Sequence, residues 1–279
     1  MLRWIDTHCH LDAPEFAADA RAVRQRAAER GVAVCVLAAV RSGDFDACGA
    51  LARRQGDAYA LGIHPLFTPH EPDDALARLD EALARNAADP HLVAVGEIGL
   101  DYFDESLRQP ALAERQQLFF TEQLKLARKH GLPVLLHTRR AADQALQSLR
   151  RVAVAGGIAH AFSGSSQQAG QFLALGFKLG FGGAATYPRA TRLRALAAAL
   201  PPEAIVLETD APDMPPRWLH VPAAARGPGQ PPERNEPGEL PRIGAEIAAL
   251  RGLPPEPWAA QTSANAVAAL PRLAALLNQ

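Results

Sequence analysis

Short apolar runs alternate along this chain with longer stretches that have the periodicity of amphipathic helices. Apolar runs bounded by helical stretches are typical of strands buried in a parallel sheet. The predicted strands are Leu2–Asp6, Val32–Leu37, Ala58–Ile63, Leu92–Gly96, Pro133–Leu136, Gly157–Ala159, Phe177–Gly180 and Ile205–Leu207. The predicted helices between them are Asp19–Arg30, Asp44–Gln55, Asp73–Asn86, Leu112–His130, Ala141–Arg150, Ser166–Leu175 and Arg189–Leu200.

Eight strands that alternate with helices predict an α/β fold of the (β/α)8, or TIM barrel, type. An open doubly wound sheet is the alternative, but it would not gather the polar residues that follow the first, fourth, fifth, sixth and eighth strands around one point. The 279 residues fit a barrel of about 250 residues. We therefore expect a single domain over residues 1–279.

The last part of the chain does not continue this alternation of strands and helices. Ala211–Gly238 is rich in Pro and Gly and has no periodicity, which predicts a long loop after the eighth strand. A loop of this length in a compact domain is usually functional or disordered. Leu240–Leu250 and Glu256–Leu277 are then predicted to be closing helices.

The charge balance excludes some classes of function. Twenty-nine basic residues against 30 acidic ones give a net charge of -1, so no field of the whole chain attracts nucleic acid or a membrane surface. Any polyanion must be bound by a local cluster. Three cysteines without metal-type spacing indicate a reducing compartment, and no apolar run is long enough to span a membrane. We expect a cytoplasmic monomer with no obligate protein partner.

Acids and histidines stand where several apolar runs end. They are Asp6, His8, His10, Glu97, His137, His160 and Asp210. Singly, each has an ordinary explanation, such as a helix cap, a buried ion pair or a hydrogen-bonded core histidine. Together, at the ends of successive barrel strands where such folds place their chemistry, they predict a metal site.

The spacing of these residues suggests roles within a metallohydrolase. His8 and His10 are two apart on a strand end, so both imidazoles face one side and can share an ion. Glu97, from the middle of the set, is the best candidate to bridge two cations, and Asp210 would bind one and orient or deprotonate a water. Mixed nitrogen and oxygen ligands suit Zn, Mn, Ni or Co better than Mg.

Other residues are candidates for binding substrate. His64 follows the third strand and could contact a phosphate or simply fix the turn before Pro65. Arg139 is a candidate phosphate clamp or a surface ion-pair partner. Arg234 and Asn235 could close over the barrel mouth or anchor their loop. Gly180–Gly183 could bind phosphate through its amides or form a tight turn that needs positive φ.

Six motifs, taken in order, resemble those of the TatD family of metal-dependent deoxyribonucleases. They are Asp6-Thr7-His8-Cys9-His10, Gly62-Ile63-His64-Pro65, Gly96-Glu97-Ile98-Gly99-Leu100-Asp101, Leu136-His137-Thr138-Arg139, His160-Ala161-Phe162-Ser163-Gly164 and Glu208-Thr209-Asp210-Ala211-Pro212. Tyr187-Pro188-Arg189 and Asp210–Pro215 look most like the YjjV-type branch of that family. The resemblance runs from residue 5 to about Asn265.

This resemblance implies an amidohydrolase-like barrel and two divalent metal cations, Mg, Mn or Zn. It implies that His8, His10, Glu97 and Asp210 hold one metal, and that Glu97, His137 and His160 hold the second. The expected activity is hydrolysis of phosphodiester bonds in DNA or an oligonucleotide, in the manner of a 3′–5′ exonuclease. Two alternatives remain at this point: the same site acting on a carbon ester or amide, for example on charged tRNA, or a non-catalytic metal-dependent accessory protein of a nuclease.

Overall fold

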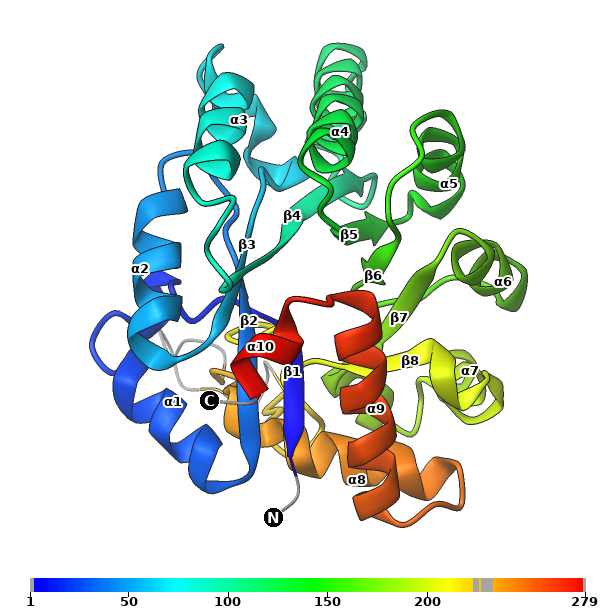
Figure 1. The fold of residues 1–279 in the computed structure, drawn as a ribbon. Coiled ribbons are helices and arrows are strands. Elements are labelled where there is room, and N and C mark those ends of the chain that lie inside the picture. The colour runs from blue at the N-terminus through cyan, green and yellow to red at the C-terminus, as the bar shows by residue number, and fades with distance from the viewer. Residues whose placement is uncertain (1–2, 223–225, 227–232, 278–279) are drawn as a thin grey trace.

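The computed structural model describes residues 3–222, 226 and 233–277. Its eight strands form one parallel sheet in the order β1 to β8, with helices around the outside (Figure 1). The strands are β1 Trp4–Cys9, β2 Val32–Ala38, β3 Ala58–Leu61, β4 Leu92–Asp101, β5 Val134–Arg139, β6 Gly157–Ala159, β7 Phe177–Phe181 and β8 Ile205–Leu207. The α-helices are α1 Ala20–Glu29, α2 Phe45–Gln55, α3 Ala75–Arg85, α4 Pro110–His130, α5 Ala142–Arg151, α6 Ser166–Ala174, α7 Thr191–Ala199, α8 Leu240–Leu250, α9 Pro255–Ala269 and α10 Leu273–Leu277.

The segment that contains β8 returns to β1, so the sheet forms a nearly closed barrel. The backbone N–H of Asp210 donates to the carbonyl of His8 at 2.9 Å, and the Thr7 hydroxyl donates to the carbonyl of Leu207 at 3.0 Å. This confirms the predicted (β/α)8 barrel.

Successive side chains of each strand point to opposite faces of the sheet, and this divides the buried apolar residues into two clusters. In β2, Val34 and Val36 belong to the inner cluster, whereas Cys35 and Leu37 pack outward against the helices. Strand side chains point alternately to the two faces of a sheet, and an eight-stranded barrel leaves room only for a filled core. The inner cluster accordingly includes several alanines and is closed at one end by Leu273 of α10.

Several predicted boundaries were wrong, and Leu2 lies outside the described residues. β1 continues beyond Asp6 to Cys9, and β3 ends at Leu61. β4 and β5 continue beyond Gly96 and Leu136 because they pair further along, Ile98 with Leu136 and Asp101 with Arg139. Glu97 and His137 are therefore inside strands and not after them. The predicted closing helix Glu256–Leu277 is interrupted between α9 and α10, where Pro271 would disrupt a continuous helix.

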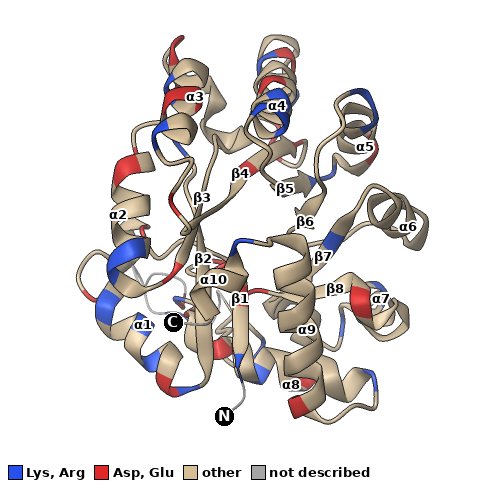
Figure 2. Cartoon of the chain, viewed as in Figure 1, with Lys and Arg blue, Asp and Glu red and all other residues tan. Residues whose placement is uncertain are grey.

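The loop predicted over residues 211–238 is only partly within the described residues, because 223–225 and 227–232 lie outside them. Its described parts hold short turns and a 3-10 helix at Pro237–Glu239. Cys9, Cys35 and Cys48 are buried free thiols. Of the helices in the described part of the chain, none has the length and apolarity to cross a bilayer. Figure 2 shows basic and acidic residues interspersed along the outer helices, as the balanced composition predicts.

Candidate metal centre

A pocket of about 920 Å³ opens at the carboxyl ends of the strands. Side chains from six segments of the barrel reach its floor, and they include most of the predicted metal ligands. The predicted site residues on its wall are His10, His64, Glu97, His137, Arg139, His160 and Asp210. His8 lies directly behind them and is fully buried.

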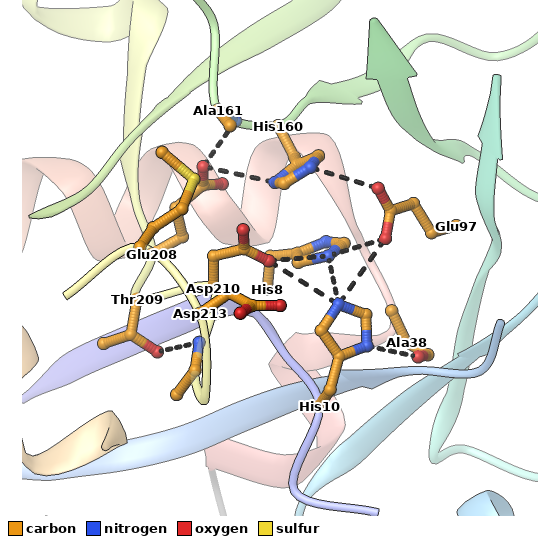
Figure 3. A network of polar contacts seen from close by, with 12 residues as sticks. His8, His10, Ala38, Glu97, His160, Ala161, Glu208, Thr209, Asp210 and Asp213 are labelled. Atoms are coloured by element: carbon orange, nitrogen blue, oxygen red, sulfur yellow. Dashed lines mark hydrogen bonds and ion pairs between the residues drawn. The ribbon is translucent and has the colours of Figure 1, made fainter. Parts of the chain in front are cut away.

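The two oxygens of the Glu97 carboxylate face two different groups of atoms. Oε2 lies 3.1 Å from Nε2 of His8 and 3.5 Å from Nε2 of His10. Oδ1 of Asp210 lies 3.6 Å and 3.5 Å from the same two nitrogens (Figure 3). Asp210 has a φ of 59°, a left-handed conformation that is uncommon outside glycine and more accessible to Asp than to most residues.

The other oxygen, Oε1, faces a second group. It lies 2.7 Å from Nδ1 of His137 and 3.1 Å from Nε2 of His160. Nε2 of His64 lies 3.4 Å from it. A carboxylate whose oxygens serve two groups on opposite sides has the geometry of a bridging ligand.

These separations fit a bound cation. Ligand atoms held about 2.1 Å from a tetrahedral ion lie about 3.4 Å from one another. The group of His8, His10, Glu97 and Asp210 has four distances between 3.1 and 3.6 Å. The donor atoms are imidazole nitrogens and carboxylate oxygens, which divalent transition metals accept. The residues of this group therefore fit a divalent transition metal ion.

Hydrogen-bond acceptors behind two of the imidazoles fix which ring nitrogen is free, and a carboxylate lies close behind a third. Nδ1 of His10 lies 2.9 Å from the carbonyl of Ala38, which can only accept, so Nε2 carries the lone pair. Nε2 of His137 lies 3.2 Å from Oδ2 of Asp101, which leaves Nδ1 free toward Glu97. Nδ1 of His160 lies 3.5 Å from Oε1 of Glu208.

Asp101 and Glu208 are therefore candidate functional residues to which sequence reasoning gave no role. Both occur in the motifs Gly96–Asp101 and Glu208–Pro212, so their position beside a candidate ligand was the available signal. Carboxylates behind metal-binding histidines hold the ring and its tautomer in place. Glu208 also accepts from the backbone N–H of Ala161. Gly180 makes room for it, since a Cβ there would meet Glu208 Oε2 at 2.1 Å.

The glycines at 180–183 thus serve close packing. Their φ angles are not positive, so the predicted alternative of a positive-φ turn was wrong.

His64 differs from the other histidines at the floor. Its Nδ1 accepts a hydrogen bond from the backbone N–H of Leu66 at 3.2 Å. Burial lowers the pKa of His64 to about 4, so the ring is neutral and carries its proton on Nε2. Nε2–H is then a donor at the pocket wall, 3.4 Å from Oε1 of Glu97, although His64, Glu97 and His137 also lie close enough together to hold an ion. This geometry suits the predicted contact with a phosphate oxygen.

The ionisable groups of the site favour the binding of a cation. Burial alone would raise the pKa of Glu97 and of Asp210, but the surrounding imidazoles hold both below their usual values. Burial opposes the charged form of His10 as well, yet the carboxylates of Asp210 and Glu97 raise its pKa to about 9. Two anionic carboxylates among imidazoles attract either protons or divalent cations.

The remaining predicted substrate residues lie in different surroundings. Arg139 is on the pocket wall, and its guanidinium lies 3.7 Å from the centre of the Phe103 ring. Arg234 and Asn235 are not among the pocket-lining residues of the described chain. Arg234 pairs with Asp19 at 2.8 Å. The buried amide of Asn235 donates to the carbonyl of Thr209 at 2.8 Å, so the geometry of both residues matches their alternative role as loop anchors.

Comparisons with known proteins bear on the family of this chain. The sequence profile of the family described as "TatD related DNase" matches residues 5–271. The chain is 43% identical over 254 residues to an uncharacterized metal-dependent hydrolase, YjjV, of Escherichia coli, covering 90% of this chain and 92% of that one. The crystal structure of YjjV superposes with a TM-score of 0.86 at 41% identity, over 97% of this chain and 98% of that one. A protein of Erwinia billingiae named 3′-5′ ssDNA/RNA exonuclease TatD is 33% identical over 266 residues, covering 94% of this chain and 96% of its own length.

Proposed function

This chain is a metal-dependent hydrolase that belongs to the TatD-related DNase family, and we propose that it hydrolyses phosphodiester bonds at the 3′ end of single-stranded DNA. The observation that carries the proposal is the division of the Glu97 oxygens between two groups of ligand atoms. Two cations on either side of one carboxylate are the usual arrangement for in-line displacement at phosphorus.

The distances around Glu97 support the ligand sets that the family resemblance implies. One cation would be held by His8, His10, Glu97 and Asp210, and the other by Glu97, His137 and His160. When bound, such ions lower the pKa of a water and neutralise charge on the phosphoryl oxygens. The proposed ions are Mg, Mn or Zn, and the nitrogen-rich ligand set favours Mn or Zn.

The protein's own groups have separate tasks in this reaction. Oδ2 of Asp210 is free to accept the proton of the attacking water, since Oδ1 faces His8 and His10. Nε2–H of His64 donates to a non-bridging phosphate oxygen, and the Arg139 guanidinium binds a second oxygen of the same or the next phosphate. Asp101 and Glu208 hold the rings of His137 and His160 through the reaction.

Single-stranded nucleic acid is the proposed substrate for two reasons. Relatives of similar length carry the name 3′-5′ ssDNA/RNA exonuclease. The chain also has a net charge of -1, which disfavours tight binding of a duplex and is compatible with processing a strand end one phosphate at a time.

The test is digestion of end-labelled single-stranded DNA by metal-stripped protein, titrated with Mg, Mn and Zn. We expect metal-dependent release of the 3′ label as a mononucleotide and a descending ladder from the 5′ label. Glu97→Ala should abolish both, and Glu114→Ala, an exposed glutamate on α4, should abolish neither. Stoichiometric metal binding without cleavage by any ion would refute the proposal and point to a carbon ester or amide as substrate.

A further inference from the structure

An exposed aromatic ring stands beside the pocket, and the guanidiniums of two arginines lie over it. Phe103 is 44% exposed, although buried phenylalanines dominate the rest of the described chain. The guanidinium carbon of Arg139 lies 3.7 Å from the centre of its ring, and that of Arg140 lies 4.7 Å away. Stacking of this kind holds both planar groups in fixed orientations.

The guanidiniums of these two arginines have no acidic partner among the described residues. Over residues 3–222, 226 and 233–277, neither side chain forms a hydrogen bond or an ion pair, although both are exposed to solvent. Arg234, by contrast, is neutralised by Asp19 and Glu236. Two positive groups without acidic partners, beside a pocket proposed to bind phosphodiesters, are complementary to a polyanion.

Hydrogen bonds connect the turn that carries Phe103 to the proposed metal ligand His137. Oδ1 of Asp101 accepts from the backbone N–H of Phe103 at 2.7 Å, while Oδ2 of the same carboxylate lies 3.2 Å from Nε2 of His137. The backbone N–H of Tyr102 donates to the carbonyl of Arg139 at 2.8 Å. The turn that carries Phe103 is therefore fixed relative to the proposed ligand His137.

The backbone of Arg140 adds an independent observation. Its φ is 56°, in the left-handed region where glycine has no steric cost and a long side chain does. Arginine at such a position gains nothing from local conformation. Its side chain lies over Phe103, and a cation–π contact of this kind offsets the conformational cost.

We propose that Phe103, Arg139 and Arg140 form a binding platform for the nucleotide adjacent to the one being cleaved. The base stacks on the platform and its phosphate contacts the guanidiniums, as in proteins that bind single strands without sequence preference. This inference rests on the proposed function. It adds that the enzyme distinguishes an oligonucleotide from a small phosphodiester by this surface, which lies next to the metal centre and is not part of it.

The experiment compares two substrates with three variants of the full chain. Phe103→Ala removes the ring, Arg140→Gly removes the guanidinium, and Arg151→Ala is the matched control. Arg151 is an exposed arginine at the last residue of α5, at the opposite end of the barrel from Arg140. The substrates are an oligodeoxythymidylate and bis(p-nitrophenyl) phosphate, and anisotropy of the labelled oligonucleotide measures binding directly.

We expect kcat/KM for the oligonucleotide to fall about tenfold in Phe103→Ala and Arg140→Gly, at least about fivefold more than for the small diester. Arg140→Gly should keep or raise the thermal midpoint, because glycine suits this φ, so its loss of binding cannot come from unfolding. Arg151→Ala should match the wild type.

Equal losses on both substrates, or no loss on the oligonucleotide, would overturn the platform while leaving the phosphodiesterase intact. If the wild type neither binds nor cleaves the oligonucleotide, the proposed function and the platform both fail.

Discussion

Replacing Asp101 by asparagine should impair the metal centre without unfolding the protein. In the wild type, Oδ1 of Asp101 accepts from the N–H groups of Phe103 and Asp104, at 2.7 and 3.0 Å, and Oδ2 accepts from Nε2–H of His137 at 3.2 Å. Burial would raise the pKa of Asp101, but these hydrogen bonds hold it at about 2, so it is an acceptor at every working pH.

The orientation of the new amide in Asp101→Asn follows from a count of hydrogen bonds. With its oxygen toward the two backbone N–H groups, the amide keeps two hydrogen bonds, each worth about 1 kcal/mol. With its oxygen toward His137 it keeps one and turns its NH₂ against two donors. The first orientation is therefore more stable, and in it the amide NH₂ is a donor that points toward Nε2 of His137. The ring must then carry its proton on Nδ1, the atom that faces Glu97 and the proposed second cation.

The expected cost is a loss of about 10- to 100-fold in affinity for the second cation, the range measured when a group behind a metal ligand is changed, or about 1.4 to 2.8 kcal/mol. Titration calorimetry with Mn on metal-stripped protein measures it, and kcat on single-stranded DNA should fall in parallel. The free energy of unfolding in urea should change by less than about 1 kcal/mol. The control is Asp104→Asn, which makes the same chemical change at the acid three residues beyond Asp101. An Asp101→Asn protein that binds two ions with wild-type affinity would refute the reasoning.

Three further substitutions test other parts of the account. His64→Phe should lower kcat about 10²- to 10³-fold yet retain every bound ion, because His64 is proposed as a donor to substrate; loss of an ion by metal analysis would contradict this. Asn235→Ala should lower the free energy of unfolding by about 2 to 4 kcal/mol in urea, because it leaves buried backbone carbonyls without a donor, and a change below about 0.5 kcal/mol would disprove the anchoring role. Burial opposes ionisation of Asp89, but the backbone N–H of His91 and the side chains of Tyr59 and Arg53 lower its pKa below 3.8, so its stabilisation is present above pH 3.8 and lost as the pH falls further. Asp89→Asn should therefore reduce the loss of stability as the pH falls below about 4, and an unchanged slope would count against the pairing.

The barrel was predictable from the sequence because each buried strand is a short apolar run and each helix keeps its own period. The ends of β4 and β5 were not predictable. Glu97 interrupts the apolar run, so polarity suggested an end at Gly96, whereas pairing with β5 continues to Asp101. A buried polar residue inside a strand signals function only once its neighbours across the sheet are known.

The floor of the site was predicted as a set because its residues are chemically unusual where they stand. The groups behind it were not, since Asp101 and Glu208 have the same local sequence character as a turn acid or a cap. Their roles depend on contacts with His137 and His160, which come from other strands. Phe103 illustrates the same limit, because nothing in its local sequence indicates that its ring will be exposed with two arginines over it.

The central claim is that the Glu97 carboxylate bridges two divalent cations. Anomalous diffraction from crystals of this protein grown with Mn tests it most directly. The account predicts two peaks about 3.5–4 Å apart, one contacting each oxygen of Glu97, the first beside His8 and His10 and the second beside His137 and His160. A single peak at saturating Mn, or two ions of which one does not contact Glu97, would contradict it.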